Sequence, residues 1–169
     1  ANISFSNTDN AFANSISYDS LGRTVSQTLN VNGNYNANAN IIGGIPMFSK
    51  VLNLNPNANC SYNRYSSFIN NEKNITTNLT TNLALSLAID IDTLLFELGY
   101  KFNYNDPSST LSAASNSPYY SQQFNAMFRL KLPFKILFET DAEYVINSQR
   151  EEGYNLNYFV WNASINKSF

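Results

Sequence analysis

The sequence predicts an all-β protein, an antiparallel up-and-down transmembrane β-barrel of about eight strands, on three observations. Residues 75–91 alternate between Ile or Leu and small or polar residues, apart from two Thr, for longer than an ordinary strand of about 3–10 residues. Similar alternation recurs along the chain. Aromatic residues make up 14% of the 169 residues, yet the mean hydropathy is only -0.29. Strands with lipid on one face and a polar interior on the other explain all three.

Composition narrows the functional classes. Charged residues make up 13% of the chain and the net charge is -2, so no nucleic-acid partner is expected, because that needs a basic face. No apolar run approaches the roughly 20 residues of a spanning helix. With no His and one Cys, the chain lacks the commonest general base and metal ligand. We therefore predict no enzyme activity, catalytic residue, metal site or cofactor.

The first two strands are expected at 3–19 and 25–43. Apolar residues change parity within the first strand, so we expect a bulge near Asp9 and Asn10. The segment Asp19-Ser-Leu-Gly-Arg23 has turn residues. In the second strand every even position from 30 to 40 is Asn, which predicts one amide-rich face.

The third and fourth strands are expected at 49–68 and 75–89. Asn again occupies alternate positions of the third strand, while Cys60 lies on the apolar face as a small apolar residue. Pro56 cannot donate to a ladder and suggests a bulge.

The last four strands are expected at 94–104, 119–132, 134–147 and 154–169. The connections at 90–93 and Pro133 are short, whereas those at 105–118 and 147–153 are long and polar. Outer-membrane barrels have short periplasmic turns and longer external loops. The short connections are therefore expected on the periplasmic side.

Aromatic residues on these strands suggest two girdles, where rings lie at the level of the lipid headgroups. The expected external girdle is Tyr100, Tyr104, Tyr119, Tyr120, Tyr158 and Trp161, and the opposite girdle is Phe128, Phe134 and Phe138. The alternative is that these are ordinary aromatic residues of a sheet core.

Charged residues gather on the predicted inner face of the fifth to seventh strands. They are Glu97, Lys101, Arg129, Lys131, Lys135, Glu139, Asp141 and Glu143. One interpretation is a substrate or ion path, or acid–base chemistry at Glu139 and Glu143. We favour a charge-compensated lumen network, because opposite charges on adjacent strands pair and nothing supplies a nucleophile with a base.

The Asn rows also allow two interpretations. Amides suit hydroxyl groups, so the rows are candidates for a sugar-binding surface. The simpler interpretation is a polar wall, because Asn offers donors and acceptors without charge. A soluble β-sandwich also alternates, but it seldom sustains ten or more alternations per strand.

Three stretches resemble the membrane barrel of TonB-dependent receptors and related outer-membrane β-barrels. The first is Asn14–Arg23 followed by Asn30–Ala37, the second is Asn59–Arg64 with Phe68–Asn71, and the third is Val160–Lys167. The resemblance implies energised uptake of a nutrient complex through a large plugged barrel. Such transporters have about 22 strands, and neither a plug domain nor an energy-coupling box is recognisable here.

These observations lead to one expectation and one alternative. We expect residues 1–169 to form a single barrel domain, or part of a larger barrel with further strands after Phe169. The expected location is the bacterial outer membrane. The expected partners are the lipid bilayer and the barrel-assembly machinery, and the ligand is unknown. The alternative is a stand-alone eight-stranded barrel with a structural, adhesive or loop-mediated binding role.

Overall fold

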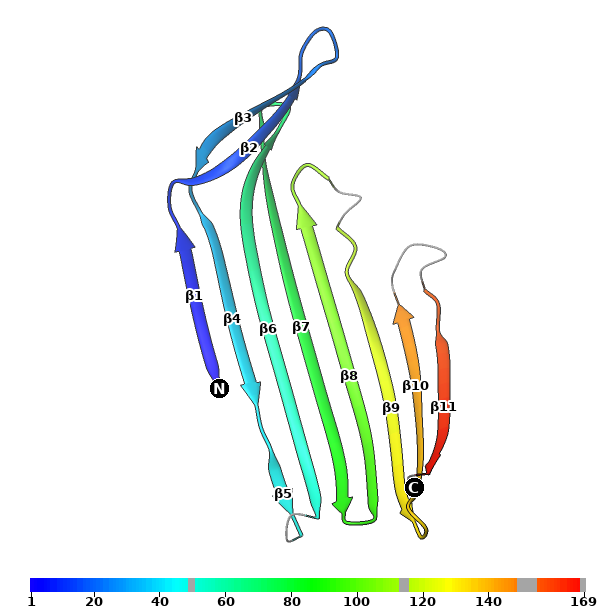
Figure 1. Ribbon diagram of the computed structural model, residues 1–169. Coiled ribbons are helices and arrows are strands. Elements are labelled where there is room, and N and C mark those ends of the chain that lie inside the picture. Colours follow the sequence, from blue (N-terminus) through cyan, green and yellow to red (C-terminus); the bar gives the residue numbers. More distant parts are fainter. Residues whose placement is uncertain (49–50, 113–115, 149–154, 168–169) are drawn as a thin grey trace.

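The computed structural model describes residues 1–48, 51–112, 116–148 and 155–167. These residues form strands and no helix (Figure 1). The strands are β1 Asn2–Thr8, β2 Ala11–Tyr18, β3 Thr24–Val31, β4 Asn34–Ile42, β5 Ile45–Met47, β6 Leu52–Ile69, β7 Glu72–Ile91, β8 Leu94–Ser109, β9 Tyr119–Leu132, β10 Ile136–Ser148 and β11 Tyr158–Lys167. The described residues therefore include no helix that is long and apolar enough to span a membrane.

All strands belong to one sheet, whose main path is β1-β4-β6-β7-β8-β9-β10-β11. Each neighbour along this path is antiparallel. The prediction of an all-β antiparallel fold is therefore confirmed. The first predicted strand corresponds to β1 with β2, and the second to β3 with β4.

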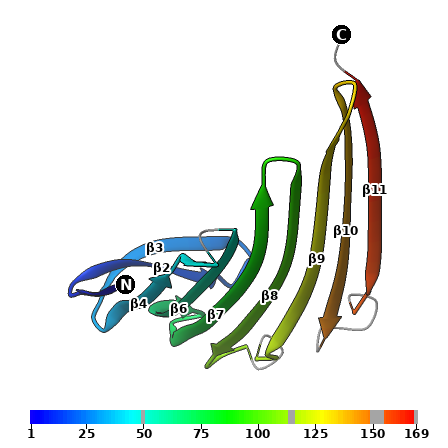
Figure 2. The same cartoon turned by 90° about the horizontal axis from the view of Figure 1, so that it is seen from below.

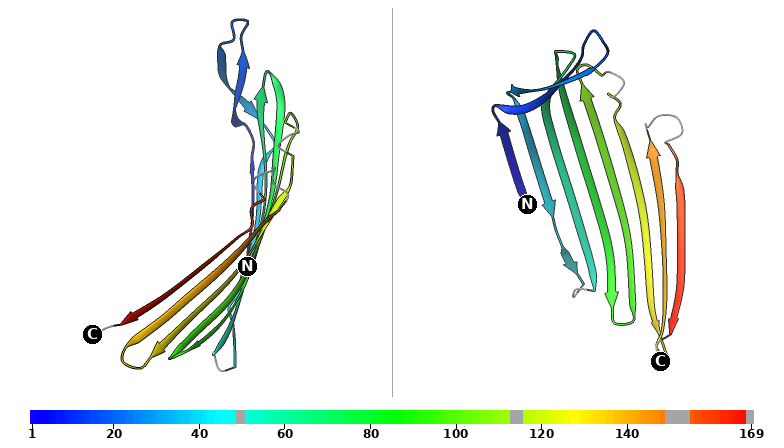
Figure 3. Two further views of the ribbon diagram at one scale, coloured as in Figure 1. Left: turned by 90° about the vertical axis from the view of Figure 1, so that its right-hand side faces the viewer. Right: turned by 45° about the horizontal axis from the view of Figure 1, so that its top comes forward.

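The predicted closure into an eight-stranded barrel is wrong for the described residues. β1 and β11 lie at opposite ends of the strand path, and no ladder joins them there. Figure 2 shows the sheet as an open arc, and Figure 3 shows its twist. Closure requires strand tilt and register stagger that bring the two edges together, and the curvature of this arc leaves them apart.

The β2–β3 hairpin departs from the main path where the β1–β4 ladder ends. Asn10 has φ 53° and Gly33 has φ 85°, so both strands change direction at the same level. β2 then meets the end of β6 in a short parallel pairing at Ser15 and Ile16. The bulge expected near Asp9 and Asn10 is instead a turn that ends β1 and begins β2, and a whole hairpin turns away from the sheet there (Figure 3).

Two proline predictions have different outcomes. The ladder between β6 and β7 runs without a break through Pro56, so the expected bulge is absent. Pro56 is tolerated because it lies opposite the gap between β4 and β5, where Gly43 N donates to Pro56 O at 2.9 Å. Pro133 lies in the β9–β10 turn as predicted, but Phe134 and Lys135 share that turn with φ 64° and 57°. The strand expected at 134 therefore begins at Ile136.

The cross-strand register separates the side chains into two faces. On the first, which we call the apolar face, the odd positions of β7 from Leu83 to Ile89 pair with Ala58, Pro56, Leu54 and Leu52 of β6 and with Phe102, Tyr100, Leu98 and Phe96 of β8. The second, the polar face, holds the even positions of β7 and the Asn residues of β6. β8 also continues to Ser109, so the long loop expected from residue 105 begins later.

Candidate functional site

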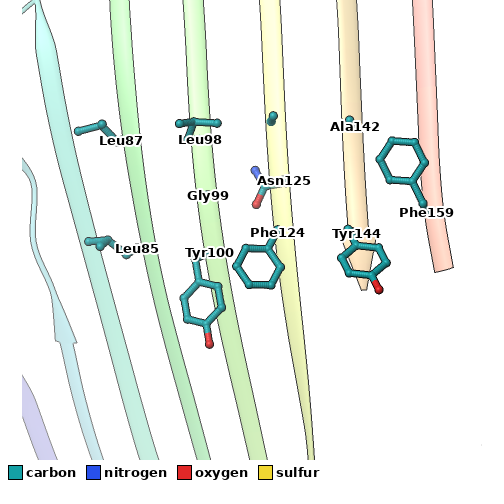
Figure 4. A pocket seen from close by; sticks show the side chains of 11 residues that line it. Leu85, Leu87, Leu98, Gly99, Tyr100, Phe124, Asn125, Ala142, Tyr144 and Phe159 are labelled. Atoms are coloured by element: carbon teal, nitrogen blue, oxygen red, sulfur yellow. The ribbon is translucent and has the colours of Figure 1, made fainter. Parts of the chain in front are cut away.

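The apolar face presents uncovered hydrophobic side chains across β7 to β11. Leu85, Tyr100, Phe124, Tyr144 and Phe159 occupy one row of the register. Four of these residues are well exposed: Leu85 46%, Phe124 44%, Tyr144 40% and Phe159 64%. These residues line a depression of about 490 Å³ (Figure 4), between whose walls lie the small residues Ala126 and Ala142.

Aromatic rings contact one another along this face. The ring centroids of Tyr100 and Phe124 are 4.9 Å apart, and those of Phe128 and Phe138 are 6.1 Å apart. Tyr104 and Tyr120 are register partners. These positions leave the two-girdle arrangement a prediction for Tyr100, Tyr104, Tyr120, Trp161, Phe128 and Phe138.

Three residues do not fit the predicted girdles. Tyr119 pairs with Asn105 and Tyr158 pairs with Val145, which places both on the polar face. The reason for Tyr119 is geometric, because successive side chains of a strand point to opposite faces and Tyr120 occupies the apolar one. Phe134 lies in a turn and is 84% exposed.

The polar face is built from amides and hydroxyls in register. One row crosses seven strands, and it consists of Asn2, Asn40, Asn59, Asn82, Asn103, Ser121 and Asn147. Some of these groups bond across strands: Asn103 Nδ2 donates to Ser121 Oγ at 3.2 Å, and Thr80 Oγ1 donates to Asn105 Oδ1 at 3.0 Å. Asn36 Nδ2 also donates to Asn63 Oδ1.

Four of the eight charged residues predicted for the inner face form contacts on the polar face. Arg129 Nε lies 2.5 Å from Glu139 Oε1, and the two residues are register partners on β9 and β10. The other carboxylates of β10 accept from amides: Gln123 Nε2 donates to Glu143 Oε2 at 2.8 Å, and Asn162 Nδ2 donates to Asp141 Oδ2 at 2.9 Å.

Four of the predicted charges remain outside these contacts. Lys131 pairs in register with Leu137, which carries no charge. Lys135 lies in the β9–β10 turn instead of on the inner face, because the turn takes the residues from 133 to 135. Glu97 and Lys101 lie on the polar face of β8, on either side of Gly99.

A second depression, of about 310 Å³, lies on the polar face beside Gly99. Its polar lining consists of Asn55, Asn57, Ser86, Glu97, Lys101 and Asn125. Ala84, Ser86 and Gly99 lack long side chains and leave the space open. The rest of the lining comes from Ile42, Gly43, Pro56, Ala84, Leu85, Gly99 and Tyr100. We call this depression the polar trough.

The polar trough was not foreseen, although the sequence holds a signal for it. The even-numbered positions of β7 lie on the polar face. Those from 74 to 82 are Asn or Thr, and those from 84 to 88 are Ala or Ser. No group of three His, Cys, Asp or Glu residues suited to a metal ion occurs among the described residues.

Comparisons with known proteins assign the chain to no family. No family model matches the chain, and neither a curated protein nor a solved structure matches it.

Proposed function

We propose that this sheet forms part of the wall of a β-barrel in the bacterial outer membrane. The apolar face contacts lipid, and the polar face lines a water-filled interior. The observation that carries the proposal is the register, which gathers uncovered Leu, Phe and Tyr side chains on one face and rows of Asn on the other. Soluble proteins rarely leave a continuous apolar surface of this kind uncovered.

Strand length supports a membrane location. A tilted strand needs about 9–11 residues to cross the hydrocarbon layer. β6, β7 and β8 have 18, 20 and 16 residues, and β9 and β10 have 14 and 13. Each is long enough to cross and to extend into the headgroup region. A β-sandwich would require a second sheet over the apolar face, and the described residues form one sheet.

The open edges favour the wall of a larger barrel over a closed eight-stranded one. In lipid, every backbone N–H and C=O group needs a partner, so exposed sheet edges do not persist. β1 and β11 therefore pair with further strands in the membrane. A larger barrel also leaves the polar face accessible, whereas side chains fill the interior of an eight-stranded barrel.

Within this proposal, the protein acts as a nutrient-uptake receptor and resembles a TonB-dependent one. The support is the sequence resemblance together with a polar face that holds a depression open to a solute. Its partners are the lipid bilayer and the barrel-assembly machinery, and the protein is not an enzyme.

The proposal is tested with two neighbouring residues of β6. Cys60 lies on the apolar face, where it pairs with Thr81, and it is exposed. Asn59 lies on the polar face, where it pairs with Asn82. The protein is reconstituted in liposomes and treated with a water-soluble maleimide. We compare the wild type with the variant that carries Cys60→Ala and Asn59→Cys.

Lipid should protect Cys60 from the aqueous reagent, and the cysteine at position 59 should react. A bilayer-soluble maleimide should reverse the preference. Equal and rapid reaction of both positions with the aqueous reagent would mean that the apolar face is not in lipid. Labelling in urea without lipid serves as the control for intrinsic reactivity.

A further inference from the structure

The polar trough has a built floor and two walls. Ala84 and Ser86 of β7 form the floor, because they present only a methyl and a hydroxymethyl group. Asn55 and Asn57 of β6 form one wall. Glu97 and Lys101 of β8 form the other wall, and Gly99 between them widens the trough.

Asn125 of β9 takes the place that a side chain at Gly99 would fill. A Cβ at position 99 would overlap the Asn125 amide group. Asn125 Oδ1 is shielded from solvent and accepts no hydrogen bond from a described residue. A shielded acceptor without a donor costs free energy, so a ligand hydroxyl that donates to a slightly rotated Asn125 amide would be stabilising.

The remaining polar groups offer both donors and acceptors. Asn55 Nδ2 donates to Ser86 Oγ at 3.3 Å, which leaves the Asn55 carbonyl available. Among the described residues, the side chains of Asn57, Glu97 and Lys101 form no hydrogen bond or ion pair with one another or with a neighbour. The carboxylate and the ammonium group carry opposite charges, so their net charge is zero.

We infer that the polar trough binds a neutral, hydroxyl-rich solute, a mono- or disaccharide. Hydroxyl groups both donate and accept, as amides do, so a saccharide can satisfy the Asn groups without bringing a charge. A volume of about 310 Å³ is at the lower end of small-molecule sites. The inference rests on the proposed function in one respect, namely that the polar face is open to water.

The test measures maltose binding by isothermal titration calorimetry. The full chain is held in an amine-oxide detergent, because a maltoside detergent would compete for the site. The variant is Ala84→Leu, which fills the floor of the trough. The matched control is Asn82→Leu, on the same strand and face but outside the trough lining. Circular dichroism checks that both variants keep the wild-type strand content.

Maltose should bind the wild type saturably. Ala84→Leu should weaken the affinity by about tenfold or more, as the loss of one or two hydrogen bonds would. Asn82→Leu should stay within about twofold of the wild type. A second variant, Asn125→Leu, should weaken maltose binding as Ala84→Leu does. Because Asn125 lies on β9, this variant shows whether the loss of binding comes from the trough and not from a disturbance of β7.

Three outcomes would overturn the inference. They are no saturable maltose binding, equal weakening by Ala84→Leu and Asn82→Leu, and preferential binding of the zwitterion glycylglycine. The liposome labelling of positions 59 and 60 is independent of these results. A lipid-protected Cys60 with no maltose binding would refute the saccharide site alone, and maltose binding with an unprotected Cys60 would refute the membrane wall alone.

Discussion

Arg129 and Glu139 face each other across the β9–β10 ladder, with Nε 2.5 Å from Oε1. Their side chains are 44% and 31% exposed, so water weakens the attraction. In a double-mutant cycle with Arg129→Ala and Glu139→Ala, we expect a coupling energy of about 0.2–1 kcal/mol. Urea unfolding of the four proteins measures it, and the coupling should decrease as salt is added.

The control cycle for this pair uses Lys131→Ala with Glu139→Ala. Lys131 lies one pleat further along β9, opposite the uncharged Leu137. Its coupling to Glu139 should be close to zero. An equal coupling in the two cycles would mean that the Arg129 contact is not specific.

Gly33 is expected to be required for the departure of the β2–β3 hairpin. Its φ is 85°, and a Cβ there would lie 2.8 Å from Arg64 Nη1, which donates to Gly33 O. Gly33→Ala should lower the free energy of unfolding by about 1–3 kcal/mol. The midpoint of urea unfolding measures the change.

Gly44 supplies the matched control for Gly33. A Cβ at Gly44 would meet its nearest atom at 3.6 Å, an ordinary contact, and its φ is not in the left-handed region. Gly44→Ala should therefore leave the unfolding midpoint nearly unchanged. If both substitutions were equally harmful, backbone strain at Gly33 would not be the cause.

Asn74 connects the start of β7 with the end of β8. Its Oδ1 accepts from Ser109 Oγ at 2.9 Å, Thr110 Oγ1 at 3.1 Å and Leu111 N at 3.0 Å. Asn74 is 5% exposed and Ser109 is 8% exposed, so Asn74→Ala leaves the buried Ser109 hydroxyl without its acceptor and should cost about 1–3 kcal/mol. The exposed Asn166→Ala should change stability by less than about 0.5 kcal/mol in the same unfolding measurement.

The turn between β2 and β3 should respond to acid. Hydrogen bonds from the Arg23 backbone and side chain hold the pKa of Asp19 below its ordinary value of 3.8. The carboxylate therefore stabilises the turn above that value, and this contribution is lost as the pH falls through the lowered pKa. A ¹³C titration of the Asp19 carboxyl should have its midpoint below 3.8 in the wild type and a higher midpoint in Arg23→Gln.

Neighbouring arginine substitutions on β7 should have unequal costs in a bilayer. Leu83 lies on the apolar face and Asn82 on the polar face. On the proposed membrane wall, Leu83→Arg should cost about 2–4 kcal/mol near the bilayer midplane, because the charge would enter hydrocarbon. Asn82→Arg should cost much less, because its side chain meets water. Urea unfolding from phospholipid vesicles compares them, and equal costs would argue against lipid on the apolar face.

The two faces could be predicted because they depend on the pleat of single strands. Asn59 and Cys60 are adjacent, and adjacent side chains of a strand point to opposite faces wherever the strand pairs. The assignment of Cys60 to the apolar face and Asn59 to the polar face follows from that period. By the same alternation, the adjacent residues Tyr119 and Tyr120 point to opposite faces and cannot both belong to one girdle. The assignment of Tyr119 to the external girdle is therefore wrong.

Other features depend on which strands meet, and the sequence does not settle those. Glu97 and Lys101 could be assigned to the polar face, but the trough between them depends on Ala84, Ser86 and Asn125 from two other strands. The pairing of Arg129 with Glu139 depends on the register across the β9–β10 turn, whose left-handed residues Phe134 and Lys135 were expected in a strand.

The sequence by itself determined an all-β antiparallel meander with one apolar and one Asn-rich face. It could do so because side-chain alternation is a local property of each strand. Only the tertiary structure decided that the sheet stays open, that the β2–β3 hairpin turns away at Asn10 and Gly33, and that small side chains on adjacent strands leave the polar trough. Closure, direction and cavity volume depend on the twist and register accumulated over all the strands, and no single strand encodes that sum.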